Sequence, residues 1–246
     1  MKNFIRYILQ RILGFDNYLF LFGIVTLRRL HGNQHEKEFI YFLNMIPANG
    51  TVLDIGANIG VMSTAIAQRV KQGKVISFEP MPDNIKVLKK MLNYFKVKNV
   101  QLIETALGDK PGELTMVLPV MNKTKMQGLS HVKEEGNEDE WNKGVEFKVP
   151  VQKLDDMQVL RKLDRLDAIK IDVENYEYYV LKGGEQLLKK HMPFIYCELW
   201  KNDKRELVMN FLKGLGYSVK VMVGNQLVDF TTQEDEMNFF FIADKN

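Results

Sequence analysis

The sequence predicts an α/β fold in which a mostly parallel sheet is covered by helices on both faces. The first observation is that short apolar segments alternate with segments of helical periodicity from residue 51 onward. The second is the run Val-Leu-Asp-Ile-Gly-Ala-Asn-Ile-Gly at 52–60, which reads as a strand followed by a glycine turn. The third is Glu79, which ends a second apolar strand nineteen residues after Gly60. A strand, a turn, a helix and a strand ending in a carboxylate form the unit with which such sheets hold a nucleoside.

One domain of ordinary size accounts for this composition. At 246 residues, 46% of them apolar, the chain can bury one sizeable core. The 34 basic and 31 acidic residues leave a net charge of +3, which is too small to favour nucleic acid as a partner. The single cysteine, Cys197, lies in an apolar run at 194–197, so we expect a small buried thiol. Without a disulfide framework, the sequence suits a reducing compartment and a cytoplasmic location.

Residues 1–36 are predicted to form a helical extension that precedes the main domain at 37–246. The segment 1–30 is aromatic and apolar, and its charged residues are Lys2, Arg6, Arg11, Asp16, Arg28 and Arg29. Its longest uncharged run, 17–27, is too short to span a bilayer. Two interpretations stay open. One is helices that pack on the domain or on a second subunit of a homo-oligomer, and the other is an interfacial helix on an anionic membrane surface.

The first half of the main domain follows the alternation of strands and helices closely. Residues 51–55 form the first predicted strand, 60–70 a helix and 74–78 the second strand. After Pro82, apolar residues recur at helical spacing, at Ile85, Leu88, Met91, Leu92 and Phe95. Residues 100–104 form the third predicted strand.

Residues 113–151 interrupt the alternation with a hairpin-like insertion. Two extra strands, at 113–118 and 145–151, are joined by a polar stretch that includes an acidic run at 134–140. A connection of this length is usually either functional or without ordered structure of its own. Two interpretations are therefore open, a lid that binds the acceptor and a loop exposed to solvent.

The second half of the domain resumes the alternation and completes a sheet of seven strands. Apolar residues at helical spacing predict helices over 180–188 and 207–215. Pro193 ends the first of these helices, and Gly214 and Gly216 end the second. The remaining strands lie at 166–172, 194–199, 217–223 and 238–242.

The spacing of the turn glycines indicates which nucleoside the sheet holds. Turns that bind NAD usually read G-x-G-x-x-G, with a middle glycine where the pyrophosphate presses on the backbone. Here Asn58 and its neighbours separate Gly56 from Gly60, and Asp54 adds a carboxylate. A cationic nucleoside without phosphates fits this turn better than a dinucleotide, which favours S-adenosylmethionine (SAM). The alternative is a tight strand-to-helix turn with no ligand.

Further cofactor contacts are expected at the ends of the neighbouring strands. Glu79 is expected to accept hydrogen bonds from the two ribose hydroxyls, with the first turn of a helix as its alternative role. The small residues Thr105 and Ala106 are expected to shape a slot for adenine. The predicted cofactor-binding residues are Asp54, Gly56, Asn58, Gly60, Glu79, Pro80, Ala106 and Asp172.

Residues 169–177 place three carboxylates within six residues, where an apolar strand ends. Burial of a carboxylate at such a place is costly unless the group is paired or used. Methyl transfer to a hydroxyl requires a positioned acceptor oxygen and a group that takes its proton. Asp172 is the first candidate for positioning, and Glu174 and Glu198 follow as proton acceptors or anchors for sugar hydroxyls. The alternative is that these acids pair with lysines or cap the next helix.

A histidine and a bound metal ion are two further kinds of candidate catalytic group. His131 lies in the predicted insertion, where it would be either a catalytic proton shuttle or a solvated loop residue. The carboxylates at the rim of the sheet are also of the type that holds Mg²⁺, an ion that acidifies a bound hydroxyl. No tight ligand spacing distinguishes a metal site, so Mg²⁺ is not favoured and no metal ligand is assigned.

Together these segments resemble the FkbM family of SAM-dependent methyltransferases. The matching segments, within residues 35 to 243, are 52–60, Phe78-Glu79-Pro80 with Asn84, 106–108, and 169–177 with 180–184. The resemblance implies a class I methyltransferase fold, which is Rossmann-like, with seven strands and an antiparallel last strand. It also implies SAM as the donor and O-methylation of a hydroxyl on a sugar, glycan or related natural-product acceptor.

The chain departs from the family pattern at two positions. The ordinary pattern after the fourth strand is D-V-E-G-Y-E, and Asn175 stands where the glycine is expected. Asn tolerates left-handed backbone better than most residues, so we expect the fold to persist. His131 follows Ser130 where members often carry a second serine, which would alter specificity. Because of Asn175, a catalytically inactive binding or scaffold protein stays an alternative, and an NAD-dependent oxidoreductase is another.

Overall fold

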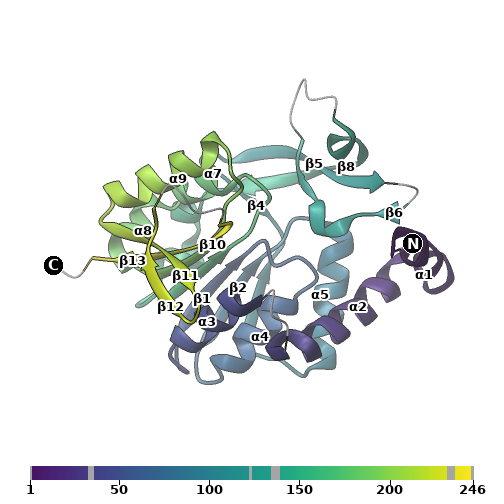
Figure 1. Cartoon of the computed structure of the whole chain (residues 1–246), viewed down its shortest axis with the longest axis horizontal. Helices are drawn as coiled ribbons and strands as arrows, with labels where there is room; N and C mark the ends of the chain where they lie inside the picture. The colour runs from purple at the N-terminus through teal and green to yellow at the C-terminus, as the bar shows by residue number, and fades with distance from the viewer. Residues whose placement is uncertain (1, 33–35, 122–123, 134–138, 232–235, 245–246) are drawn as a thin grey trace.

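A central sheet of eight strands organises the computed structural model, which describes residues 2–32, 36–121, 124–133, 139–231 and 236–244 (Figure 1). The strands are β1 (Thr51–Ile55), β2 (Lys74–Phe78), β3 (Val100–Ile103), β9 (Ala168–Ile171), β10 (Phe194–Glu198), β11 (Tyr217–Val223), β12 (Gln226–Asp229) and β13 (Asn238–Ala243). Their order across the sheet is β12-β11-β13-β10-β9-β1-β2-β3. The final strand, β13, runs antiparallel to both of its neighbours, β10 and β11. The predicted α/β fold with an antiparallel last strand is confirmed.

The strand β12 was not predicted and extends the expected seven strands to eight. It pairs antiparallel with β11, and Val223 opposite Gln226 leaves a two-residue turn at Gly224-Asn225. Gly224 has a φ of +63°, as the first residue of such a hairpin turn requires. A Gly-Asn pair between two apolar runs is a known hairpin signal, so this strand was within reach of sequence reasoning.

The sheet reverses its strand order at β1. The chain builds β1, β2 and β3 outward in one direction, and it returns with β9 and β10 on the other side of β1. β1 therefore pairs in parallel with both β2 and β9. Ligands of such sheets bind beyond the carboxyl ends of the strands at this switch point. The ends of β1, β2 and β9 are where a site is expected.

Helices cover both faces of the sheet (Figure 1). One face carries α3 (Lys37–Met45), α4 (Val61–Arg69) and α5 (Pro82–Tyr94), and the other carries α6 (Gln158–Arg161), α7 (Glu177–Lys182), α8 (Glu185–His191) and α9 (Asp203–Gly214). Alternate residues of β1 join different cores, because Leu53 packs on the second face and Val52 on the first. The helix α3 was not predicted, although its buried residues Phe39, Phe42 and Leu43 recur at helical spacing.

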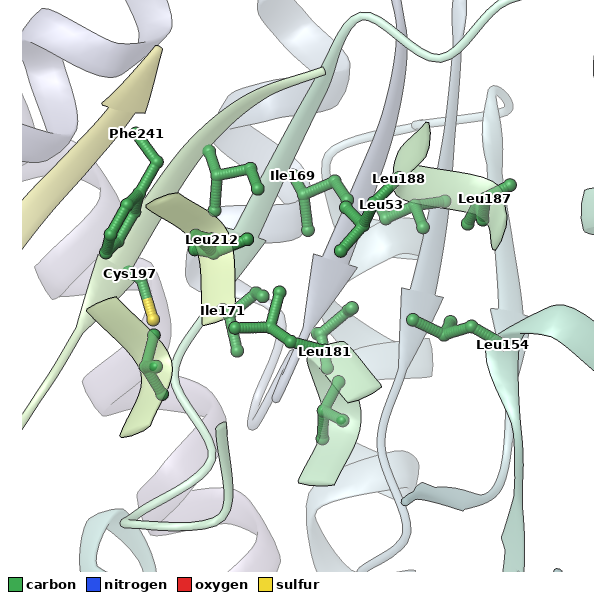
Figure 2. Close-up of a cluster of buried hydrophobic side chains, with 14 of the residues drawn as sticks. Leu53, Leu154, Ile169, Ile171, Leu181, Leu187, Leu188, Cys197, Leu212 and Phe241 are labelled. Atoms are coloured by element: carbon green, nitrogen blue, oxygen red, sulfur yellow. The ribbon is translucent and has the colours of Figure 1, made fainter. Parts of the chain in front are cut away.

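Figure 2 shows the apolar cluster between the sheet and the helices α7, α8 and α9. Leu53 and Ile169 of the sheet contribute to it together with Leu181 and Leu212 of the helices. Cys197 of β10 lies fully buried in this cluster, as predicted for a small apolar thiol. Burial raises the pKa of the Cys197 thiol well above its ordinary value, so the thiol is an inert part of the core.

The single helix predicted over 180–188 is divided into α7 and α8 at Gly183-Gly184. A Cβ atom on Gly183 would lie 2.0 Å from the carbonyl oxygen of Gly108. A Cβ atom on Gly184 would lie 2.7 Å from Leu154 Cδ1. The break therefore reflects close contacts with distant segments, which helical periodicity cannot reveal.

The insertion contributes most of a second sheet, which has five strands in the described residues. Its strands are β4 (Ala106–Leu107), β5 (Gly112–Met121), β6 (Thr124–Lys125), β7 (His131–Val132) and β8 (Gly144–Gln152). β5 and β8 are the two predicted extra strands, and they pair antiparallel from Gly112 opposite Val151 to Pro119 opposite Gly144. Of the predicted acidic run, residues 134–138 lie outside the described part of the chain.

Two helices, α1 (Lys2–Leu13) and α2 (Phe15–Arg29), precede the main domain. α2 packs on α4 and α5, and a Cβ atom on its Gly23 would lie 3.1 Å from Met91 Sδ. Gln10 of α1 exchanges two hydrogen bonds with the backbone of Lys125 in β6, at 3.2 and 3.3 Å. Of the two interpretations of this segment, packing on the domain agrees with the position of α2. Residues 33–35, beside the predicted boundary at 36, lie outside the described residues.

Candidate functional site

Two cavities meet at the carboxyl ends of β1 and β9. The first holds about 700 Å³ of empty space, open mouth included, and the second about 1200 Å³. Strand ends and the insertion line the first cavity, and α1 and α2 contribute to the wall of the second. Five residues, which we call the cavity junction, line both: Gly56, Asn58, Gln127, Gly128 and Asp172. The cavity junction is the place where ligands from the two cavities would meet.

The turn after β1 needs its two glycines for contacts within the protein. Gly56 has a φ of +79°, and a Cβ atom there would lie 1.8 Å from the carbonyl oxygen of Asp172. Gly60 has a φ of +85°, and a Cβ atom there would lie 2.8 Å from Leu88 Cγ of α5. Gly56 lines both cavities, as expected of a cofactor contact, whereas Gly60 lines neither. A glycine is therefore needed at position 60 so that α4 can pack on α5, and not for a ligand contact.

Glu79 lies at the end of β2, in the wall of the first cavity. Its carboxylate accepts hydrogen bonds from the backbone amides of Asn58 and Met81, at 2.7 and 2.9 Å, and from Asn84 Nδ2 at 3.1 Å. Burial outweighs these hydrogen bonds and raises the pKa of Glu79 to about 7. A carboxylate has about four acceptor positions. The three protein donors thus leave room for a ligand hydroxyl at Glu79.

Lys170 is a buried cation at the centre of the site, and no role was predicted for it. It is the register partner of Asp54 on the adjoining strand, so both side chains lie on the same face of the sheet. Lys170 Nζ lies 3.5 Å from Asp54 Oδ1 and 3.4 Å from Asp172 Oδ2, and it donates a hydrogen bond to the carbonyl oxygen of Gly56 at 3.0 Å. Burial opposes the charge, but the two carboxylates outweigh burial and raise the pKa of Lys170.

Asp54 was predicted to contact the cofactor, but it lies beneath the site and lines neither cavity. Its side chain is fully buried, and one carboxylate oxygen accepts a hydrogen bond from Ser63 Oγ at 2.5 Å. Ser77 Oγ donates in turn to Ser63 Oγ at 3.0 Å. Asp54 therefore acts on the cavity junction through Lys170, which binds both the glycine turn and Asp172.

Three further carboxyl groups surround Asp172 and favour their protonated forms. Burial, with the charge of Asp172 as the next cause, raises the pKa of Glu174 to about 9 and the pKa of Glu198 to about 7. Burial also raises the pKa of Glu177 to about 7, although backbone amides donate hydrogen bonds to its carboxylate. Glu174 lines the first cavity, whereas Glu198 lines neither. With Lys170 as its one buried lysine, this cluster is suited to a further positive charge.

The turn after β9 has left-handed backbone at two consecutive residues. Glu174 has a φ of +51° and Asn175 a φ of +72°. Asn175 thus adopts left-handed backbone, which asparagine tolerates better than most residues. Asn202 Nδ2 donates a hydrogen bond to Asn175 Oδ1 at 2.9 Å, and Asn175 N donates to Glu177 Oε1 at 3.1 Å. The turn therefore accommodates the asparagine side chain, as expected for a fold that persists.

Small and apolar residues complete the wall of the first cavity. Pro80 and Ala106, both predicted as cofactor contacts, line it together with Thr105. Thr105 Oγ1 donates a hydrogen bond to the carbonyl oxygen of Pro150 at 2.9 Å, which joins this end of the central sheet to the insertion. Tyr176 adds an aromatic ring to the same wall. Such a wall suits a flat, largely apolar ring system.

His131 is buried within the insertion and lines neither cavity. The residue is 1% exposed, with Nδ1 2.8 Å from the carbonyl oxygen of Leu129 and Nε2 3.3 Å from Asn142 Oδ1. Its ring packs on Trp141, with 3.8 Å between the ring centroids. A proton shuttle needs a ring nitrogen that reaches the substrate. This position speaks against a catalytic His131, and the alternative of a solvated loop residue is wrong because the side chain is buried.

The insertion reaches the turn after β1 through Gln127. Gln127 Nε2 donates a hydrogen bond to Asn58 Oδ1 at 3.0 Å, and the same oxygen accepts one from the backbone amide of Ile59 at 2.8 Å. Gln127 and Gly128 belong to the cavity junction, and Ser130 lines the first cavity. No role was predicted for Gln127, because its contact spans 69 residues of sequence and has no local signal.

The carboxylates at the rim of the sheet do not assemble into a metal site in the described residues. No group of three or more His, Cys, Asp or Glu side chains in these ranges is arranged to hold a metal ion. Asp54, beneath the cavity junction, and Asp172, within it, both pair with Lys170.

Known proteins related to this chain identify its family. The family model of the Methyltransferase FkbM domain matches residues 54–219, which is more than half of the chain. Methyltransferase sdnD of Sordaria araneosa is 27% identical over 206 residues, covering 74% of this chain and 79% of that protein. Methyltransferase 1 of Beauveria bassiana is 25% identical over 167 residues, covering 61% of this chain and 65% of that protein.

A solved structure shares the fold. The crystal structure of Methyltransferase FkbM from Methylobacillus flagellatus KT matches with a TM-score of 0.54 and 16% identity over 80% of this chain. This chain covers 44% of that structure, so the likeness concerns less than half of the larger protein. A glycine turn, an acid at the end of β2 and a carboxylate cluster after β9 lie within the matched residues 54–219. The chain belongs to the FkbM family of methyltransferases.

Proposed function

We propose that this protein transfers a methyl group from SAM to a hydroxyl of a sugar, glycan or related natural-product acceptor. The observation on which the proposal depends is that Asp172 lines both cavities where they meet. Membership of a methyltransferase family supplies the class of reaction and speaks against an NAD-dependent oxidoreductase.

The first cavity fits the adenosine part of SAM. Its empty space of about 700 Å³ falls within the roughly 300–1,000 Å³ that is typical of small-molecule sites. Glu79 offers an acceptor for a ribose hydroxyl, and Thr105 and Ala106 leave space beside an apolar wall. The place where a dinucleotide pyrophosphate would need a glycine holds Asn58, whose side chain is bonded to Gln127. These features support a nucleoside without a pyrophosphate.

The cavity junction fits the cationic part of SAM. Burial and the charge of Asp172 raise the pKa of Glu174 and of Glu198, and a nearby positive charge favours their ionised forms instead. Lys170 is the resident cation, and it is already engaged by Asp54 and Asp172. When bound, SAM supplies a methyl group on a positively charged sulfur.

The protein's own residues would orient the acceptor and remove its proton. The acceptor hydroxyl would approach from the second cavity, and it must lose its proton as its oxygen attacks. The side chain of Asp172 is 40% exposed and lines both cavities, so it is placed to hold this hydroxyl and take the proton. Lys170 fixes the Asp172 carboxylate from below. Burial and the charge of Asp172 raise the pKa of Glu174 to about 9, so Glu174 is protonated before SAM binds, and the positive charge of SAM favours its ionised form.

The test compares Asp172→Asn with Asp167→Asn, which alters the residue just before the other end of the same strand. Asp167 accepts a hydrogen bond from the backbone amide of Thr51 at 2.7 Å, far from the cavity junction. Calorimetry measures the affinity for S-adenosylhomocysteine (SAH), and radiolabelled SAM measures methyl transfer to a panel of sugars, glycan precursors and hydroxylated natural products. We expect Asp172→Asn to bind SAH but to transfer methyl groups at least about 100-fold more slowly than the wild type.

Asp167→Asn should retain both SAH binding and methyl transfer. The proposal fails if the wild-type protein does not bind SAH, or if Asp172→Asn transfers methyl groups as fast as the wild type. Methyl incorporation at nitrogen or carbon, with none at oxygen, would contradict the proposed acceptor class while leaving the donor site in place.

A further inference from the structure

The outer sides of α1 and α2 expose large apolar side chains that the domain leaves uncovered. α2 packs on the domain through a different face, which includes Leu19, Gly23 and Leu27. The exposed apolar residues of the two helices are Ile8, Leu9, Ile12, Leu21, Phe22 and Val25. Ile12, at 74%, is the most exposed large apolar residue of the described chain. Apolar side chains gathered in this way indicate an interaction surface.

Arginines accompany these apolar side chains. The two helices carry Arg6, Arg11, Arg28 and Arg29. Two of them donate hydrogen bonds to tyrosine hydroxyls, each at 3.1 Å, rather than to carboxylates. Asp16, the single acid of this segment, lies 3.8 Å from Lys86 of the domain. Within the described residues none of the four arginines forms an ion pair, so the surface carries uncompensated positive charge.

We propose that α1 and α2 dock this protein on an anionic membrane surface. Helices that lie in a membrane interface combine exposed apolar side chains with basic residues, and each arginine near anionic lipid adds attraction. Nucleic acid would match the arginines but would leave the apolar side chains uncovered. A second copy paired through the same faces would bring two sets of arginines together, which like-charge repulsion opposes.

The two helices meet at a sharp bend. No single helix of the described residues is long and apolar enough to cross a bilayer. The segments Arg6–Leu13 and Phe15–Arg29 pass such a test only as a pair, and they are bent by 118°. Gly14 joins them with a φ of +74°, a backbone conformation that favours glycine.

The second cavity opens beside the docking surface. Phe22 is exposed and also lines this cavity, together with Arg6, Gln10, Tyr18 and Thr26. A docked protein thus presents the mouth of the cavity to the membrane. If the cavity admits the acceptor, the acceptor is a hydroxyl compound held at the membrane surface. That last step rests on the proposed function, whereas docking itself does not.

The test measures sedimentation of the full chain with phosphatidylcholine vesicles that contain or lack phosphatidylglycerol. We expect binding to the anionic vesicles only, and binding should weaken as salt is added, because salt screens the arginines. Ile12→Asp should weaken the partition at least about tenfold, because burial of a large aliphatic side chain contributes that much. Arg28→Gln should weaken it about fivefold.

Matched controls lie on α9, on the far side of the molecule (Figure 1). Leu207→Asp and Lys213→Gln make the same kinds of change at exposed positions there and should bind as the wild type does. Thermal unfolding establishes that every variant is folded, and SAH titration tests the donor site separately, so docking and methyl transfer can fail independently.

Equal binding to both kinds of vesicle, or an Ile12→Asp variant that binds like the wild type, would overturn the proposal. A third result would also overturn it. If sedimentation analysis shows that the wild type is a dimer and Ile12→Asp is not, and if vesicles bind neither of these two proteins, a second copy of the chain covers the surface.

Discussion

Replacement of Lys170 by methionine is expected to destabilise the protein by about 3–5 kcal/mol, the usual cost of removing one partner from a buried ion pair. Asp54 dominates this loss, because its side chain is fully buried and would keep only the hydrogen bond from Ser63 Oγ. Asp172 is 40% exposed and can turn to water, so it adds little. The carbonyl oxygen of Gly56 loses a donor, which costs about 1 kcal/mol within this range.

Urea unfolding followed by circular dichroism at pH 8 measures the effect, and a fall in melting temperature of about 10 °C should accompany it. The matched control is the double variant Asp54→Asn/Lys170→Met, which removes the buried negative charge as well and should recover most of the loss. A loss below about 1 kcal/mol in Lys170→Met, or an equal loss in the double variant, would refute this electrostatic explanation.

Three further predictions concern the glycine turn, the ribose contact and pH. Gly56→Ala should unfold at a much lower temperature than the wild type, whereas Gly214→Ala, with no atom within 4 Å of its added Cβ, should not. Glu79→Gln should weaken SAH binding about tenfold in calorimetry, since hydrogen bonds to a charged group are strong; unchanged affinity would remove the ribose assignment. The buried carboxyls of Glu79 and Glu177 have pKa values of about 7 against an ordinary 4.5, so the folded state holds these protons more tightly than the unfolded state. Their stabilisation is fully present below about pH 4.5 and is lost as the pH rises through about 7, by about 3 kcal/mol for each group. Urea titrations of the ligand-free protein in which stability rises from pH 5 to pH 8 would contradict this.

Sequence reasoning located the strands and the ends that bear the site, because both depend on local patterns. A parallel strand between two layers of helices is a short apolar run, and the residue that follows it stands at the rim of the sheet. Glu79, Asp172 and Glu174 were placed in this way, and each lines the first cavity. The turn's tolerance of Asn175 was also anticipated, because asparagine adopts left-handed backbone more readily than most residues.

The residues that were missed or misplaced depend on pairings between distant segments. Lys170 matters because register sets it opposite Asp54, and register is known only once the strand order is known. Gln127 reaches Asn58 from an insertion whose position has no local signal. His131 was judged by its loop-like surroundings in the sequence, yet Trp141 covers it in the fold. For Lys170 the sequence did offer one sign, because a lysine within an apolar strand indicates a buried charge that must be paired.

The central claim is that a sulfonium nucleoside binds across the cavity junction, and a crystal structure with SAH measures this directly. We expect the ribose hydroxyls to lie within hydrogen-bond distance of Glu79 and the sulfur to lie beside Asp172, at the opening to the second cavity. Adenine should contact Ala106 in the first cavity. Crystals in which SAH is absent from both cavities, or in which its sulfur points away from Asp172, would contradict the account.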